Sequence, residues 1–141
     1  EKRLKDHAYD LVVVDYLQLL EPKRRSYRGD YERVTSVSAE LVAMARSFNA
    51  AVVVAAQFNR DGNDKQPSMA EIKGSGQIEQ DADLIFSLWR NFGDMAPIGT
   101  RKVRVDLLKN RNGMVWRNSN TRQFALLLEE GIYRFRGIAP S

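Results

Sequence analysis

Two short runs of β-branched apolar residues, separated by an amphipathic segment, constrain the fold of this chain more than any other feature. The first run is LVVVD at residues 11–15, and the second is AAVVVAA at residues 50–56. Such runs are typical of strands in parallel sheets, which are buried on both faces. Between them, residues 30–48 repeat apolar side chains every three or four positions, which predicts a helix with Asp30 as its N-cap and Asn49 at its C-terminal end. The order strand, helix, strand predicts an α/β fold with a parallel sheet.

The sequence predicts a third buried strand at residues 82–90, ADLIFSLWR. Three later segments either alternate apolar and polar residues or are joined by short turns, namely residues 102–109, 122–129 and 132–136. This pattern predicts β-hairpins. We therefore expect a parallel sheet that is extended at its edge by C-terminal antiparallel hairpins.

The composition argues against several kinds of site and location. The chain has 141 residues, of which 43% are hydrophobic, and this suits one domain with its own core. It has no cysteine and a single histidine, His7, which argues against thiolate or imidazole metal sites. No apolar run approaches the roughly 20 residues of a membrane span, and there is no signal peptide, so we expect a cytoplasmic protein with no membrane partner.

Charge is distributed unevenly along the chain. Residues 1–100 contain 13 Lys and Arg against 15 Asp and Glu, whereas residues 101–141 contain 9 against 3. A basic C-terminal part suits an anionic partner such as a nucleic acid or a nucleotide, or it serves only as a solubilising surface. Charge alone leaves both interpretations open.

A polar residue follows each of the first two predicted strands. Asp15 ends the first strand, and Gln57 directly follows the second. In an open α/β sheet, ligands bind outside the carboxyl ends of the strands, and an aspartate there can hold Mg²⁺ near nucleotide phosphates. The alternative for Asp15 is that it caps the following turn, and the alternative for Gln57 is that it is an exposed loop amide without a ligand.

Four blocks of sequence together resemble a known family. They are DYLQLL at residues 15–20, AAQFNR at 55–60, GSGQIEQDADLIFSLWR at 74–90 and KNRNG at 109–113. Their content and order, across nearly all of residues 4–136, resemble the C-terminal motor domain of replicative DNA helicases of the DnaB family. The resemblance implies a RecA-like P-loop ATPase core that hydrolyses ATP or another nucleoside triphosphate with Mg²⁺. It also implies hexameric rings that move along single-stranded DNA in a bacterial or phage-infected cell, with primase and a helicase loader as possible partners.

The resemblance assigns roles to several residues at the nucleotide. Asp15 matches the aspartate associated with Mg²⁺, through a water molecule, and Gln57 matches a sensor of the γ-phosphate. Lys109 and Arg111 match a pair that reaches the nucleotide of the neighbouring subunit, where an arginine finger stabilises the charge of the transferred phosphoryl group. A basic hairpin tip without a partner is the alternative for this pair. Gln18 either orients phosphate or water, or supports the loop.

A second group of residues is implied to contact DNA. Lys73, Gly74, Ser75 and Gly76 match a DNA-binding loop that usually reads R-E-S-G in the family, so Lys replaces Arg and Gly74 replaces Glu here. A flexible loop without this role is the alternative. Arg24 and Arg25, beside Tyr27 in KRRSYR, could contact phosphates while Tyr27 stacks on a base, or the segment could be a solvated loop.

The IEQDAD segment, residues 78–83, carries several carboxylates. We expect it to cap a short helix and to engage basic residues at a subunit seam, in preference to binding a metal.

One part of the expected motor is missing from the sequence. A P-loop requires G-x-x-x-x-G-K-[ST], and no Gly in this chain is followed by Lys. The chain begins at Glu1 with a helix-like segment that runs into the first strand, so we interpret residues 1–141 as the C-terminal part of a RecA-like helicase ATPase domain whose P-loop portion lies upstream. This part alone is expected to be inactive, and its sheet should have exposed edges or form a dimer.

Two other functions remain open at this point. One is a RecA-like ATPase of recombination or repair, although IEQDAD and KNRNG favour the helicase. The other is a non-catalytic module for DNA binding or ring interaction, whose function would rest on its basic C-terminal part.

Overall fold

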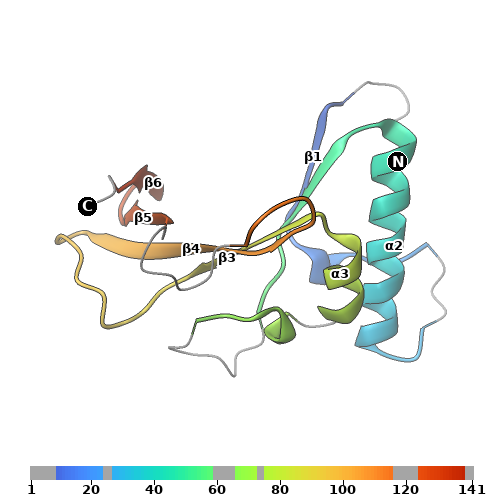
Figure 1. Ribbon diagram of the computed structural model, residues 1–141, viewed down its shortest axis with the longest axis horizontal. Coiled ribbons are helices and arrows are strands. Elements are labelled where there is room, and N and C mark those ends of the chain that lie inside the picture. Colours follow the sequence, from blue (N-terminus) through green and yellow to red (C-terminus); the bar gives the residue numbers. More distant parts are fainter. Residues whose placement is uncertain (1–8, 24–26, 59–65, 73–74, 116–123, 139–141) are drawn as a thin grey trace. The chain divides into compact units, whose positions relative to one another are not determined.

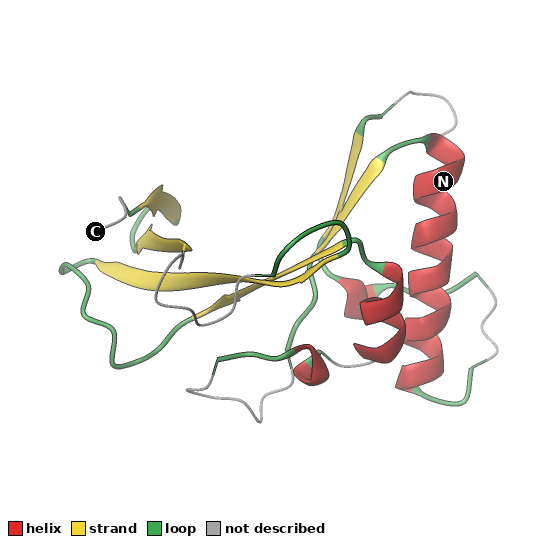
Figure 2. Ribbon diagram, viewed as in Figure 1, coloured by secondary structure: helices red, strands yellow, loops and turns green. Residues whose placement is uncertain are grey.

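The computed structural model describes residues 9–23, 27–58, 66–72, 75–115 and 124–138 (Figure 1). The chain divides into two compact units. The first comprises residues 1–59 and 70–81, and the second comprises residues 60–69 and 82–141. The first unit contains the long helix and two strands, whereas the second is built from strands (Figure 2).

The first unit has the predicted strand, helix and strand. Strand β1 (Leu11–Val14) and strand β2 (Ala51–Val54) pair in parallel, and helix α2 (Asp30–Phe48) connects them. The register runs from Leu11 opposite Ala51 to Val14 opposite Val54. Both strands are shorter than predicted, so Asp15 lies just outside the ladder and Gln57 lies three positions beyond the end of β2.

Helix α2 has the predicted bounds but a different N-terminal cap. Gly29 occupies the N-cap position and Asp30 is already helical, so the prediction that Asp30 caps the helix is wrong. The Glu32 carboxylate instead reaches back and accepts a hydrogen bond from the backbone N–H of Arg28 at 2.7 Å. At the other end Asn49 takes the left-handed conformation, with φ of 49°, as expected for a helix stop.

The core of the first unit lies between α2 and the segment after β1. Leu17, Val34 and Val37 are buried together there. Leu17 belongs to η1 (Leu17–Leu19), a single 3-10 turn. Helix α3 (Ser75–Asp81) packs on α2, where the Asp81 carboxylate accepts a hydrogen bond from Ser38 Oγ at 2.7 Å. The short η3 turn (Met69–Glu71) precedes α3.

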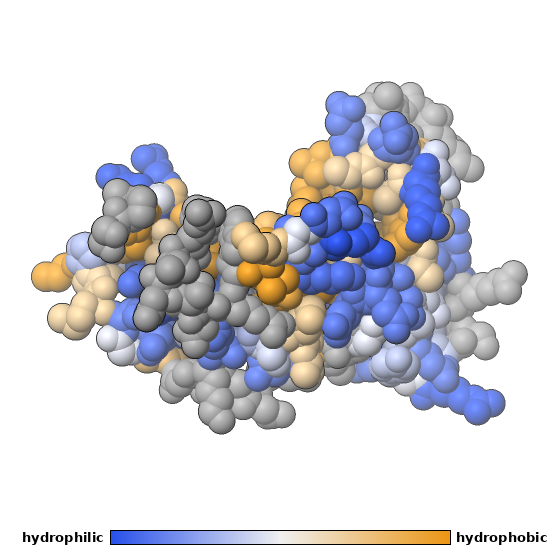
Figure 3. Space-filling model, viewed as in Figure 1, coloured by the Kyte–Doolittle hydropathy of each residue, from blue (hydrophilic) through white to orange (hydrophobic). Residues whose placement is uncertain are grey.

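One face of the β1–β2 pair is exposed. Leu11, Val13 and Val53 retain 53%, 66% and 54% of their accessible surface. Hydrophobic side chains accordingly reach the surface over β1 (Figure 3). The prediction that these strands are buried on both faces is therefore wrong for this chain, although their parallel pairing is confirmed.

The second unit is a four-stranded antiparallel sheet in the order β3–β4–β5–β6. Its strands are β3 (Leu84–Trp89), β4 (Thr100–Asn110), β5 (Phe124–Glu129) and β6 (Arg134–Gly137). The predicted hairpins are present. The predicted arrangement differs in one respect, because β3 pairs antiparallel with β4 and no strand ladder joins it to β1 or β2 among the described residues. The hairpins thus extend the β3 ladder and not the parallel pair.

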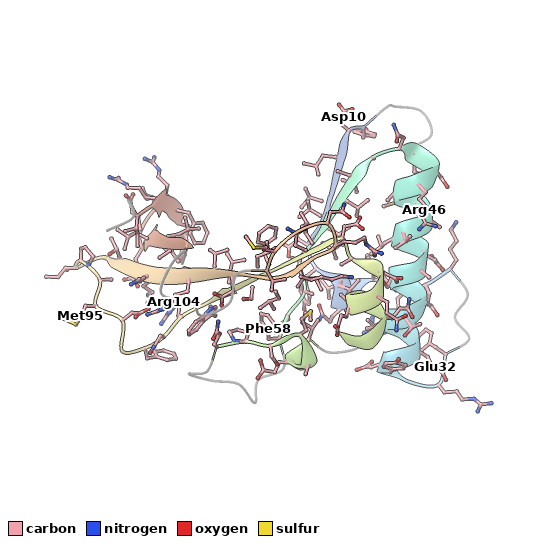
Figure 4. All side chains as sticks on the ribbon, in the orientation of Figure 1. Asp10, Glu32, Arg46, Phe58, Met95 and Arg104 are labelled. Carbon is pink, nitrogen blue, oxygen red and sulfur yellow. The ribbon has the colours of Figure 1, made fainter. Side chains whose placement is uncertain are left out.

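Polar side chains fix the second unit internally. Asp106 is 3% exposed, and its Oδ2 accepts hydrogen bonds from Trp89 Nε1 at 2.6 Å and from Gln66 Nε2 at 3.2 Å. Arg104, labelled in Figure 4, forms a two-point ion pair with Asp94 and lies over the Trp89 ring. Over the described ranges, no helix is long and apolar enough to cross a membrane.

Candidate functional site

Asp15 and Gln57 lie at the carboxyl ends of neighbouring parallel strands, as predicted. Asp15 directly follows β1, and Gln57 lies three positions after β2. Both residues are exposed. The chain leaves β1 through a cis peptide bond between Asp15 and Tyr16 and enters η1. Figure 4 labels Asp10 at the start of β1, so the opposite end of this strand presents Asp15.

Backbone hydrogen bonds continue between the two segments beyond the strands. Ala55 N–H donates to Val14 C=O at 2.9 Å, and Leu17 N–H donates to Ala55 C=O at 2.8 Å. Leu17 is buried in the core two positions after the exposed Asp15, so the leucine anchors the segment that presents the carboxylate.

The Gln18 side chain bonds to both backbone groups of Gln57. Gln18 Nε2 donates to Gln57 C=O at 3.2 Å, and Gln57 N–H donates to Gln18 Oε1 at 3.3 Å. Of the two roles considered for Gln18, support of the loop is the one that these contacts favour. The Gln57 side chain takes no part in them.

Arg33 is a supporting residue that the sequence did not reveal. It projects from α2 and is only 9% exposed. Its Nη1 donates to Gln18 C=O at 3.0 Å and to Leu20 C=O at 2.8 Å, which satisfies two carbonyl groups of the segment after Asp15. The sequence gives no indication of this role, because the partners of Arg33 are backbone carbonyl groups of another segment.

A single carboxylate at this edge fits a magnesium ion that is shared with phosphates. Within the described ranges, no group of three or more His, Cys, Asp or Glu residues could hold a metal ion. Mg²⁺ usually keeps several waters and takes only one or two protein carboxylates when a nucleotide supplies the other ligands. The exposed carboxylate of Asp15 suits that chemistry, and a closed protein cage for a metal is not what these residues build.

Lys109 and Arg111 lie at the end of β4 in the second unit. Lys109 is opposite Ile85, next to a bulge that leaves Leu108 without a partner on β3, and bulges commonly redirect neighbouring side chains. Arg111 begins the following turn. Its N–H donates to Asp83 C=O at 2.9 Å, and its Nε lies 2.6 Å from Asp83 Oδ1. The guanidinium remains about half exposed, with 49% of the side chain accessible.

The IEQDAD segment ends in two acidic residues with intrachain partners. Asp81 is held by Ser38 and by Gln77, whose Nε2 donates to its Oδ1 at 2.9 Å. Asp83 engages Arg111 of the same chain. The segment does end a short helix, α3, and does engage a basic residue. Contacts at a subunit seam remain a prediction.

The residues predicted to contact DNA are only partly described. Lys73 and Gly74 lie outside the described residues, as do Arg24 and Arg25. Ser75 and the exposed Gly76 form the first turn of α3 and are therefore helical.

The hydroxyl of Tyr27, a candidate for base stacking, donates a hydrogen bond to Glu21 Oε2 at 2.5 Å.

Much of the basic charge in the C-terminal part is paired within the second unit. Four arginines there make ion pairs with acidic side chains, namely Arg101 with Glu130, Arg104 with Asp94, Arg111 with Asp83 and Arg136 with Glu129. The Arg104 guanidinium holds the pKa of Asp94 below its ordinary value of 3.8, and burial opposes this effect. These ion pairs neutralise part of the basic charge locally, so the folded unit presents less unpaired positive charge than the sequence of residues 101–141 suggests.

A family model matches nearly the whole chain. The DnaB-like helicase C-terminal domain matches residues 1–135.

Curated proteins with similar sequences are replicative helicases. The chain is 34% identical over 119 residues to the replicative DNA helicase DnaC of Bacillus subtilis (strain 168). This alignment covers 81% of this chain and 26% of that protein. It is 36% identical over 112 residues to the replicative DNA helicase DnaB of Mycoplasma genitalium. This alignment covers 73% of this chain and 24% of the relative. The chain thus spans about a quarter of the length of these relatives.

A solved structure is similar in fold as well as in sequence. It is a DnaB-like replicative helicase, described with its interactions with primase. The two structures agree with a TM-score of 0.67 at 31% identity, over 82% of this chain and 27% of the other.

Proposed function

Because the chain belongs to the family of DnaB-like helicase C-terminal domains, we propose that it is part of a replicative helicase motor that couples nucleoside triphosphate hydrolysis to movement along single-stranded DNA and to duplex unwinding. The proposal rests on one observation: Asp15 and Gln57 follow neighbouring parallel strands, and hydrogen bonds between Gln18 and Gln57 connect the two segments after those strands. This is the edge where open α/β sheets bind ligands. Residues 1–141 then act as the C-terminal part of a RecA-like ATPase domain.

The two polar residues divide the work at the nucleotide. Asp15 would hold Mg²⁺, and the ion would neutralise phosphate charge when bound. Gln57 presents its side-chain amide just after β2. A change in its hydrogen bond to the γ-phosphate would shift the segment that follows it. The P-loop glycines and lysine are absent from this sequence, so this chain alone is not expected to turn over ATP.

Lys109 and Arg111 act on the nucleotide of a neighbouring subunit. The Arg111 side chain is half exposed, and its ion pair with Asp83 can be exchanged for a phosphate, because exposed ion pairs contribute only about 0–1 kcal/mol. Such exchange requires head-to-tail subunits, and a closed ring such as a hexamer provides them at every interface. Lys73–Gly76 with Arg24 and Arg25 are proposed to contact DNA. Primase is a proposed partner by analogy with the similar helicase structure, and a helicase loader is proposed from the family resemblance of the sequence alone.

A complementation experiment tests the arrangement in trans. In the complete helicase, Asp15→Asn and Arg111→Ala should each abolish ATPase activity while nucleotide binding persists for Arg111→Ala. Mixing the two inactive proteins should restore activity, because about a quarter of the interfaces in a randomly mixed ring pair an intact Asp15 with an intact Arg111. The control is Arg134→Ala, a change on exposed β6, which should keep full activity. Absence of recovery in mixed rings would refute action in trans, and an active Asp15→Asn enzyme would refute the nucleotide site.

The alternative functions have less support. The named relatives are replicative helicases, which disfavours a recombination ATPase. The pairing of four arginines with acids within the second unit weakens the case for a module whose function is its basic surface.

A further inference from the structure

The contact between Gln18 and Gln57 is unusual because one side chain satisfies both backbone groups of a residue 39 positions away. A primary amide can do this only when its oxygen faces the N–H and its nitrogen faces the C=O. The pair acts as one more rung of the β1–β2 ladder, placed beyond the last paired residues Val14 and Val54. It therefore ties together two segments that have already left the sheet.

Two hydrogen bonds hold the backbone around Gln18. The preceding residue, Leu17, is 4% exposed and donates its N–H to Ala55 C=O. The backbone C=O of Gln18 accepts a hydrogen bond from the buried Arg33. The Gln18 side chain therefore reaches Gln57 from a segment whose backbone is hydrogen-bonded to Ala55, just after β2, and to Arg33 of helix α2.

We propose that Gln18 is a positioning residue that sets the backbone of Gln57 relative to Asp15. This inference rests on the proposed function, and it adds a residue that need not contact the nucleotide. Asp15 lies three positions before Gln18 on the same segment, and Gln18 is hydrogen-bonded to the backbone of Gln57. The positions of the Asp15 carboxylate and the Gln57 amide are therefore coupled through Gln18. A displaced Gln57 would still allow ATP to bind, but it would lower the fraction of bound nucleotide that reaches the reactive geometry.

The test uses the complete helicase and variants that separate position from chemistry. Gln18→Met keeps the length of the side chain and removes both hydrogen bonds. Gln18→Glu keeps the acceptor for Gln57 N–H and places a charge against Gln57 C=O. Leu19→Ala is the matched control, because this side chain lies in the same turn and is 65% exposed. We expect the kcat of DNA-stimulated ATP hydrolysis to fall about tenfold in both Gln18 variants, with KM for ATP nearly unchanged.

A double variant separates positioning from a general structural effect. If Gln18 acts through Gln57, then Gln18→Met combined with Gln57→Ala should be no slower than Gln57→Ala alone. Hydrogen exchange at the Gln57 amide should also be faster in Gln18→Met than in Leu19→Ala. The inference is overturned if kcat is unchanged in Gln18→Met, or if the two substitutions multiply their effects. A wild-type helicase without DNA-stimulated ATPase would instead refute the proposed function, and amide exchange at Gln57 would still decide the coupling.

Discussion

Asp94 and Arg104 form an ion pair that is largely shielded from solvent. Their side chains are 11% and 18% exposed, and Arg104 donates from Nε to Asp94 Oδ2 at 2.7 Å. The Arg104 hydrogen bond is the main cause of the lowered pKa of Asp94, with burial acting in the opposite direction. A carboxyl group whose pKa is lower in the folded state stabilises the fold above its unfolded pKa, and this contribution is lost as the pH falls through the folded pKa.

Asp94→Asn should therefore lower stability in a pH-dependent way. At neutral pH we expect a loss of about 2 kcal/mol in the free energy of unfolding, because a charged hydrogen bond is removed. As the pH falls below 3.8 and through the lower folded pKa, the wild type loses the same contribution and the two proteins should converge. Thermal unfolding across this range measures the difference. Asp83→Asn is the control, since its carboxylate is 79% exposed and its loss should cost at most about 1 kcal/mol. A constant difference at all pH values would contradict the assignment.

At the same scale, the sequence predicted that polar residues follow the first two strands and offered loop support as one role of Gln18, but it did not predict the contacts through which Gln18 and Arg33 give support. Asp15 and Gln57 could be placed because strand ends are visible as the limits of apolar runs. The partner of Gln18 is the backbone of Gln57, and the partners of Arg33 are carbonyl groups of a turn. Backbone partners leave no pattern in the side chains, so these contacts could not be predicted.

Secondary-structure elements were predicted to the extent that their patterns are local. Helix α2 has the predicted bounds, because its apolar side chains repeat with the helical period. The direction in which β3 pairs is not a local property. Its six residues, LIFSLW, suit either a parallel or an antiparallel neighbour, and only the register with β4 decides between them.

The turn after β4 depends on Asn110, and this dependence can be tested with a glycine. The Asn110 side chain accepts from Asn112 N–H at 3.3 Å and donates to Met114 C=O at 3.3 Å. A Cβ at Gly113 would lie 2.6 Å from Asn110 Nδ2, so Gly113→Ala must displace this amide. We expect the turn that carries Arg111 to loosen, and the kcat of the complete helicase to fall about tenfold by misplacement of the guanidinium.

The control for this change is another strand-end glycine. A Cβ at Gly137 on β6 would meet no atom within 4 Å, so Gly137→Ala should leave ATPase activity unchanged. Steady-state ATPase assays of the two variants give the comparison. Equal activity of both variants would show that the Asn110 contacts do not position Arg111.

At the scale of the whole molecule, each unit exposes an apolar strand face. In the first unit the face consists of Leu11, Val13 and Val53. In the second unit, the alternating side chains of β3 that face solvent are about half exposed, namely Leu84, Phe86 and Leu88. Parallel strands are normally covered on both faces, and exposed apolar strands favour association with other chains. The strand periodicity was visible in the sequence, but which face stays uncovered is set by elements distant in the chain.

We therefore expect the purified chain to self-associate. Sedimentation velocity should show an average mass that increases with protein concentration, because association removes these faces from water. Val13→Lys combined with Phe86→Lys should shift the chain toward the monomer. Met95→Lys is the control, since Met95, labelled in Figure 4, is 94% exposed in a loop and belongs to neither face. A wild-type chain that remains monomeric at every concentration would contradict the expectation. An equal effect of Met95→Lys would mean that added charge, and not the strand faces, controls association.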